Sequence, residues 1–350
     1  MADSYTPTYP LGDKGVVSSE AERRALGLTM FAGEVLNFFD DMTIMDGKHK
    51  QVTVQSGKTF QWPATSKVKA AYHKAGDEIT GQTPQQSQVT ISIDDILYSD
   101  LFFADVYEAL SHFETRGEYA QAAARELAKT KDIHVMSEIC KAANSAATIP
   151  GYTNGGSVIV SDSFKIDAAG AADVAEKALA LFEAFYQAAQ VFIEKNVPKP
   201  WYAALRPNEY FAMVKAIQSN GFSLANKDFM MSPANLNEGS LPRLAGFDIV
   251  VTNLLPTTNR TATGDASGGT PGTHAFTPTH TNHTNAHTKT MGILWNPEAV
   301  GSVILKGLQV KSQYQLHRFG DLLVAYYLMG HGVLRPECAI ELSLDNLTVA

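Results

Sequence analysis

Four histidines in the C-terminal third of the chain are the residues whose type and spacing could bind a metal: His274, His280, His283 and His287. Zinc takes three or four ligands in fixed directions at about 2 Å, and further hydrogen bonds hold those ligands in place. Here the histidines lie in a segment rich in Thr and Asn, with no carboxylate from Thr273 to Thr290. We therefore predict no metal site, and a metal-dependent enzyme built on the 274–287 loop is kept only as an alternative.

Two pairs of neighbouring carboxylates, Asp40–Asp41 and Asp94–Asp95, are the other candidates for chemistry, as a general acid and base. Adjacent side chains point to opposite faces of a strand and lie about 100° apart on a helix, so neither pair can face one substrate. The sequence also contains no GxSxG, HExxH, GxGxxG or phosphate-loop pattern. We predict no catalytic residues and no cofactor, and thus a protein that is not an enzyme.

The composition is that of a folded protein of more than one unit, because single cores stop growing below the 350 residues found here. Hydrophobic residues make up 45% and charged residues 18% of the chain, enough apolar side chains for real cores. The net charge of -8 argues against binding to a phosphate backbone, which needs clustered Lys and Arg. No stretch approaches the roughly 20 apolar residues of a membrane span, so we expect no membrane partner.

A long helix from Phe103 to about Ala146 is the element around which we expect the others to be arranged. Apolar residues recur every three or four positions between Val106 and Leu127, which places them on one helix face. No proline interrupts the run before Pro150, so the helix could extend over about 40 residues, or about 60 Å. The alternative is two helices with a kink at residues 130–132, where the apolar stripe weakens.

The segment from Gln51 to Asp94 has apolar residues at every second position, which predicts strands. Its simplest geometry is a two-stranded excursion that leaves the body near Ser56 and returns near Ile93. A hairpin alone is marginally stable in water, so we expect this one to lie on a neighbouring surface. The alternative is a hairpin that folds back on its own subunit.

After Gly151, helices and strands alternate without a regular βαβ repeat, which predicts an α+β fold. The expected elements are a helix at Val174–Phe192, a strand at Trp201–Leu205, a helix opened by Pro207, and strands at Phe247–Val251, Met291–Trp295, Val303–Val310 and Leu322–Met329. Residues 257–290 are expected to form an exposed loop, and the tail from Val333 to Leu347 to join a sheet.

Several short segments, read together, resemble the major capsid protein of short-tailed bacteriophages, podoviruses of the Autographiviridae type. None is specific alone, but they follow the family's order along most of the chain. They are Gly33-Glu34-Val35-Leu36, Ser56-Gly57-Lys58, Pro63, Ala70-Ala71-Tyr72, Gly76, Ile93-Asp94, Asp105, Glu108-Ala109, His112, Arg116, Glu118-Tyr119, Gly246-Phe247, Ala299-Val300-Gly301, Met329-Gly330-His331-Gly332 and Leu334-Arg335-Pro336-Glu337. The 257–290 loop and the first 15 residues depart from the family pattern.

The resemblance implies an HK97-like capsid fold with five parts. They are an N-terminal arm (1–50), an extended β-hairpin loop (51–94), a peripheral domain with a long spine helix (95–150), an α+β axial domain (151–325) and C-terminal strands that return to the sheet (326–350). From the loop prediction and the family segments, we expect contacts between subunits at Lys58, Phe60, Trp62, Pro63, Tyr72, Arg116 and Arg335.

The function implied is self-assembly into the hexamers and pentamers of an icosahedral shell around the double-stranded DNA of a tailed phage. The resemblance also implies a scaffolding protein during assembly, a portal at one vertex, packaged DNA bound without sequence specificity, and location in the virion after assembly in the host cytoplasm. Some proteins of this fold join subunits through a Lys–Asn bond, but no catalytic carboxylate is identifiable here, so we expect a non-covalent shell. An encapsulin-like compartment remains an alternative.

Overall fold

The computed structural model describes residues 35, 43–66, 68, 70, 72–76, 78–79, 81, 83, 86–93, 96–104, 116–147, 154–161, 164, 171–219, 243–255, 260–261, 264–265 and 290–344. The chain divides into two compact units. The larger unit comprises Ile44–Ile96, Lys129–Gly307 and Leu328–Ala350, and the smaller comprises Met1–Thr43, Leu97–Ala128 and Leu308–Tyr327.

Within the described residues, the larger unit contains a six-stranded mixed sheet in the order β5-β14-β11-β6-β8-β7. Strand β11 runs antiparallel to both β14 and β6, whereas β6 and β8 are parallel, as are β14 and β5. The strands are β5 (Ser157–Val160), β6 (Trp201–Leu205), β7 (Arg243–Leu244), β8 (Phe247–Val251), β11 (Thr290–Trp295) and β14 (Ala339–Ser343). This mixed order confirms the α+β prediction and the strands expected at 201–205, 247–251 and 291–295.

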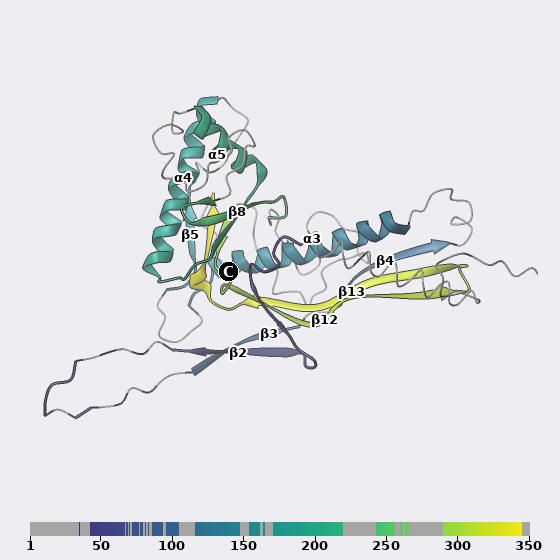
Figure 1. Cartoon of the computed structure of the whole chain (residues 1–350), viewed down its shortest axis with the longest axis horizontal. Coiled ribbons are helices and arrows are strands. Elements are labelled where there is room, and N and C mark those ends of the chain that lie inside the picture. Colours follow the sequence, from purple (N-terminus) through teal and green to yellow (C-terminus); the bar gives the residue numbers. More distant parts are fainter. Residues whose placement is uncertain are drawn as a thin grey trace, which may run out of the picture. The chain divides into compact units, whose positions relative to one another are not determined.

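Two helices, α4 (Ala171–Glu194) and α5 (Pro207–Ser219), lie side by side in the larger unit (Figure 1). Proline suits the first position of α5, where its missing N–H would have no helical partner. The inner face of α4 buries Leu181, Phe185 and Phe192 completely. The rings of Phe185 and Phe192 lie 5.8 and 5.6 Å from that of Phe247 in β8, so aromatic packing joins the helix to the sheet.

Helix α3 spans Arg116–Ala143 without interruption, which makes it about 42 Å long at roughly 1.5 Å per residue. The alternative of a break at residues 130–132 is therefore wrong. The predicted start at Phe103 is also wrong, because Phe103 and Ala104 end strand β4 (Leu97–Ala104). That strand pairs with β13, including Phe103 with Asp321, a partner far away in the sequence.

The excursion predicted between Ser56 and Ile93 is present as a two-stranded antiparallel ribbon, here called the ribbon (Figure 1). It consists of β2 (Thr59–Thr65) and β3 (Gln86–Ser92), and it is paired from Thr59 with Ser92 to Thr65 with Gln86. Alternate residues of both strands are exposed, as expected for a ribbon with one face on protein.

Two long strands, β12 (Val300–Gln315) and β13 (Gly320–Val333), run through both units. They belong to a sheet of order β1-β12-β13-β4. In the larger unit β1 (Lys50–Thr53) runs parallel to the start of β12, and in the smaller unit β4 runs antiparallel to the start of β13. The remaining described elements are the short pair β9 (Arg260–Thr261) and β10 (Gly264–Asp265) and the 3-10 turn η3 (Pro336–Cys338).

Candidate functional site

The described residues between β2 and β3, here called the ribbon tip (residues 68–83), place apolar side chains in solvent. Val68 is 73% exposed, Ile79 is 76% exposed, and Tyr72 is fully exposed. Exposed apolar side chains that gather on one projecting segment mark a surface that another molecule covers. The ribbon tip is therefore the first candidate for contact with a neighbouring molecule.

The base of the ribbon packs on its own chain. Ile91 and Ile93 are buried together with Val303 and Leu334, and the half-buried rings of Phe60 and Trp62 pack against this cluster. The two rings meet edge to face, 4.6 Å apart. The base thus follows the alternative of a hairpin folded on its own subunit, whereas the ribbon tip does not.

The other predicted contact residues of the ribbon lie at its surface. Lys58 and Pro63 are exposed, and the Lys58 carbonyl accepts the backbone N–H of Ile93 at 2.7 Å, which closes the ribbon at its base. Arg116 is the first residue of α3, and its side chain lies outside the part of the chain that the structure describes. A role for any of these residues between subunits stays a prediction.

Arg335 lies in an ion network within the larger unit. Its Nε donates to Glu337 at 2.8 Å and its Nη1 donates to Glu298, which also pairs with Lys50 at 3.3 Å. Burial alone would lower the pKa of the guanidinium, but the hydrogen bond and charge of Glu337 raise it. Because Glu337 is buried, Arg335 neutralises a carboxylate that would otherwise be costly in the folded chain.

A second polar cluster, not predicted from the sequence, fastens residues 44–49, here called the strap, to α3. Fully buried Asp132 accepts the backbone N–H groups of Ile44 at 2.8 Å and Met45 at 3.3 Å. Next to it, Lys131 donates to Asp46 at 2.7 Å. The strap leads directly into β1 and then the ribbon, so these contacts set where the ribbon begins. Two adjacent charged residues at the weak point of the apolar stripe were the available signal.

Burial strongly shifts the pKa of one group on the strap, His49, and of one group on α3 that faces it, Asp132. Burial raises the pKa of Asp132 to about 6, because the ionised carboxylate loses its water. Burial also lowers the pKa of His49 to about 4. The neutral ring donates from Nδ1 to the Met45 carbonyl at 2.8 Å, and Gln51 lies 3.2 Å from its Nε2.

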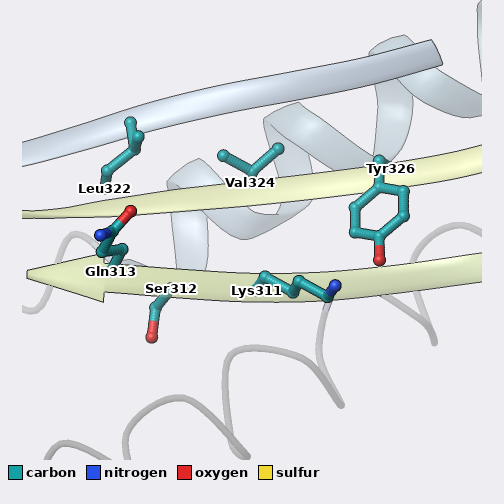
Figure 2. A pocket seen from close by; sticks show the side chains of 6 residues that line it. All are labelled: Lys311, Ser312, Gln313, Leu322, Val324 and Tyr326. Atoms are coloured by element: carbon teal, nitrogen blue, oxygen red, sulfur yellow. The ribbon is translucent and has the colours of Figure 1, made fainter. Parts of the chain in front are cut away.

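A shallow apolar groove of about 360 Å³ lies over side chains of the paired strands β12 and β13 in the smaller unit. Figure 2 shows Leu322, Val324 and Tyr326 on β13 beside Lys311, Ser312 and Gln313 on β12. The Lys311 ammonium lies 5.4 Å from the Tyr326 ring centre, and the Tyr326 hydroxyl donates to Gln309 at 2.8 Å. The groove thus has an apolar floor with a fixed aromatic ring at one end.

The described part of the chain offers neither a group of metal ligands nor a helix that could span a membrane. His274, His280, His283 and His287 lie outside it, as do most residues of the predicted 257–290 loop. Among the residues that the structure does describe, no group of three or more His, Cys, Asp or Glu side chains could hold a metal. No described helix has the length and apolar character needed to cross a bilayer.

The chain is similar in sequence to major capsid proteins of bacteriophages. A family model described as Gp10A-like, major capsid protein, matches residues 61–343. The major capsid protein of Escherichia phage T7 is 28% identical over 335 residues, which cover 93% of each chain.

Two solved structures extend the likeness to the fold. The capsid structure of the cyanophage P-SCSP1u is 30% identical, with a TM-score of 0.67 over 87% of this chain and 89% of that one. The mature capsid of bacteriophage PhiM1 is 16% identical, with a TM-score of 0.68 over 87% of this chain and 88% of that one.

Proposed function

The chain belongs to the Gp10A-like family of major capsid proteins, and from this premise we propose that its ribbon tip fastens each copy to the next in the shell. As a member, it has the HK97-like capsid fold, and it forms the capsid shell of a tailed phage and is located in the virion. The observation that carries the proposal is the exposure of Val68, Tyr72 and Ile79 on a projecting segment.

The parts of the fold take the roles that the sequence suggested. Residues 1–50 serve as the N-terminal arm, 51–94 as the extended loop and 95–150 as the peripheral domain with α3 as its spine. Residues 151–325 serve as the axial domain, which meets its copies around five-fold and six-fold axes, and residues 326–350 return to the sheet. The continuous α3 and the mixed sheet of the larger unit support this division.

Assembly proceeds through head-to-tail contacts that close by rotation into pentamers and hexamers. Each contact can be weak, because a copy in a closed shell is held by several neighbours at once and leaves only when all of those contacts break. A misplaced copy at an open edge has fewer contacts, so it can still dissociate. Modest interfaces therefore favour a correctly closed shell.

The groove between β12 and β13 of a neighbouring copy is the surface on which the ribbon tip lies. The groove offers Leu322, Val324 and the Tyr326 ring, and the ribbon tip offers Val68, Tyr72 and Ile79. Burying both sets removes apolar area from water at about 25 cal/mol per Å². The Tyr326 ring is already buried in its own chain, so most of the area removed from water belongs to the ribbon tip. An aromatic residue such as Tyr72 commonly carries much of the energy of such contacts.

Other partners follow from the shell. They are a scaffolding protein during assembly in the host cytoplasm, a portal at one vertex, and double-stranded DNA inside. A net charge of -8 suits a wall along which DNA slides without adhering.

The protein acts by assembly and is not an enzyme. The family match along residues 61–343 favours a phage shell over an encapsulin-like compartment.

The test is the triple variant Val68→Ser, Tyr72→Ser and Ile79→Ser, expressed with a scaffolding protein. We expect the unassembled chain to keep its melting temperature, because these side chains are exposed, while shells counted by electron microscopy fall at least tenfold. The matched control, His73→Asn with Glu78→Gln, changes polar residues of the same ribbon tip and should assemble normally. Wild-type yields from the triple variant would refute the role of the ribbon tip.

A further inference from the structure

Two glycines of β13, Gly330 and Gly332, lie against the base of the ribbon and are here called the glycine seat. A Cβ on Gly330 would overlap the backbone carbonyl oxygen of Ser92 in β3, and a Cβ on Gly332 would lie 2.9 Å from the side chain of Ile91. Glycine in a strand often marks a place where another backbone approaches closely. The glycine seat thus lets the ribbon lie closer to β13 than any other residue would allow.

The opposite face of β13 is held at the same place. Successive residues of a strand point to opposite faces, so His331, between the two glycines, points away from the ribbon. His331 is buried, and its Nδ1 shares a hydrogen bond of 2.7 Å with the Ser302 hydroxyl on β12. Its ring centre lies 6.2 Å from that of buried His134 on α3. Because β12 and α3 support this part of β13, a side chain added to the glycine seat would displace the ribbon and not the strand.

A small displacement at the base becomes larger along the ribbon. Strand β2 has seven residues, so the paired ribbon is about 20 Å long at roughly 3.3 Å per residue. The base contact from Ile91 to Ile93 is only about 7 Å long by the same rise, so a lift of about 1 Å at one end would move Thr65 by about 3 Å. The glycine seat therefore determines the direction in which the ribbon leaves the larger unit.

We propose that Gly330 and Gly332 are positioning residues for assembly, which set the angle of the ribbon so that its tip reaches the neighbouring copy at the spacing of a shell of one diameter. This inference rests on the proposed role of the ribbon tip, whereas the angle itself is a property of the single chain. Contacts that close by rotation give one closed assembly only if their geometry repeats. A seat made of backbone supplies that repeat, because it has no side-chain rotamers that could vary.

Spin labels on the unassembled chain measure the angle. One label is placed at Thr65→Cys on the ribbon, and the second at Gln187→Cys or Lys306→Cys, all exposed positions of the larger unit. The native thiols of Cys140 and Cys338 are buried, so they should not take up label. Two label pairs are used because a tilt in one direction can leave a single distance unchanged.

Variants of the glycine seat should change these distances. Gly332→Ala should shift at least one of them by about 2 Å or more, given the length of the ribbon. Adding Ile91→Ala removes the side-chain atoms that the new Cβ would meet, so it should restore both distances. Gly330→Ala should shift the distances as well, and trimming a side chain cannot relieve it because the obstacle is the Ser92 backbone. The matched control is Gly307→Ala on β12, where a Cβ would meet no described atom within 4 Å.

Shells formed with a scaffolding protein show the consequence for assembly. In Gly332→Ala the fraction of shells with the wild-type diameter, counted by electron microscopy, should fall at least fivefold, and adding Ile91→Ala should restore it. Unchanged label distances in Gly332→Ala, no recovery in the double variant, or wild-type shells despite a shifted ribbon would each overturn the proposal. Normal assembly of the ribbon-tip variant, with shifted and recovered label distances here, would refute the role of the ribbon tip but support the effect of the glycine seat on the ribbon.

Discussion

The carboxylate of Asp132 accepts the backbone N–H of Ile44 at 2.8 Å, across 88 positions of sequence. Through this bond α3 holds the strap, which continues into β1 and then into the ribbon. Residue Met45 of the strap is fully buried in the core of the larger unit, and the Trp295 indole donates to the Lys48 carbonyl at 2.9 Å. The ribbon thus starts from a point fixed by helix, sheet and core together.

Asp132→Ala should destabilise the unassembled chain. The variant leaves the N–H groups of Ile44 and Met45 without their acceptor, and an unsatisfied buried donor costs about 1–3 kcal/mol. We expect a loss of about 2 kcal/mol in the free energy of unfolding by urea. Hydrogen exchange at residues 44–45 should be at least tenfold faster, while β6 stays protected. Asp132→Asn keeps one acceptor and removes the buried charge, so its loss should be smaller. Unchanged exchange at 44–45 in Asp132→Ala would contradict this role.

The pH dependence of stability should contain two opposed contributions, one from Asp132 on α3 and one from His49 on the strap. Asp132 has a pKa near 6 when folded against an ordinary value of 3.8, so the folded chain takes up this proton first and gains stability as pH falls from 6 to 4. His49 has a pKa near 4 when folded against 6.5, so the unfolded chain takes up that proton first and stability is lost as pH falls from 6.5 to 4. The two largely cancel in the wild type.

Single variants expose each contribution. In His49→Asn only the Asp132 contribution remains. As pH falls from 6.5 to 4.5, the free energy of unfolding of this variant should therefore rise by up to about 3 kcal/mol relative to the wild type. In Asp132→Asn the free energy of unfolding should fall by a similar amount over the same pH range, because only the His49 contribution remains. Urea unfolding at several pH values measures both. If the two variants shift the pH profile in the same direction, the assignment of these protons is wrong.

Arg335→Met should lower stability even before assembly. The change leaves buried Glu337 without its 2.8 Å partner, and Glu298 keeps only Lys50. Hydrogen bonds to charged groups contribute about 1.5–3 kcal/mol, so we expect a loss of about 2 kcal/mol in chemical unfolding. Arg335→Lys keeps the charge but cannot reach both carboxylates in a fork, so it should recover only part of the loss. If Arg335→Met is as stable as the wild type, the ion network does not stabilise the chain, and only the predicted contact between subunits is left as a role for Arg335.

The subunits of purified shells should run as single chains on a denaturing gel. The lysines at positions 58, 67, 69 and 74 lie in the extended loop, but the sequence offers no carboxylate in a catalytic pattern to join one of them to an Asn. We therefore expect one band at the 37.9 kDa of the monomer. A ladder of covalent multimers that survives boiling and reductant would show that subunits are cross-linked.

Local patterns predicted several elements well. The strand at Trp201–Leu205 and the helix opened by Pro207 depend on a short apolar run and a fixed proline φ, which act within a few residues. The ribbon was also predictable, because a period of two on both sides of a polar stretch identifies two strands that can pair.

Long-range contacts explain what the sequence did not show. The apolar pattern around Phe103 predicts a helix, yet pairing with Asp321 across the sheet makes Phe103 a strand residue. Two charges interrupt the apolar stripe at residues 130–132, which favours a kink at these residues. They remain helical because Asp132 and Lys131 find partners on the strap, more than 80 positions earlier. No pattern within a short window can reveal such partners.

A reconstruction of assembled shells by electron cryomicroscopy would show where the ribbon tip lies. We predict that the ribbon tip, with Tyr72, crosses to a neighbouring copy and lies on the groove formed by Leu322, Val324 and Tyr326. Density that instead shows the ribbon tip folded onto its own subunit, with that groove open to solvent, would contradict it.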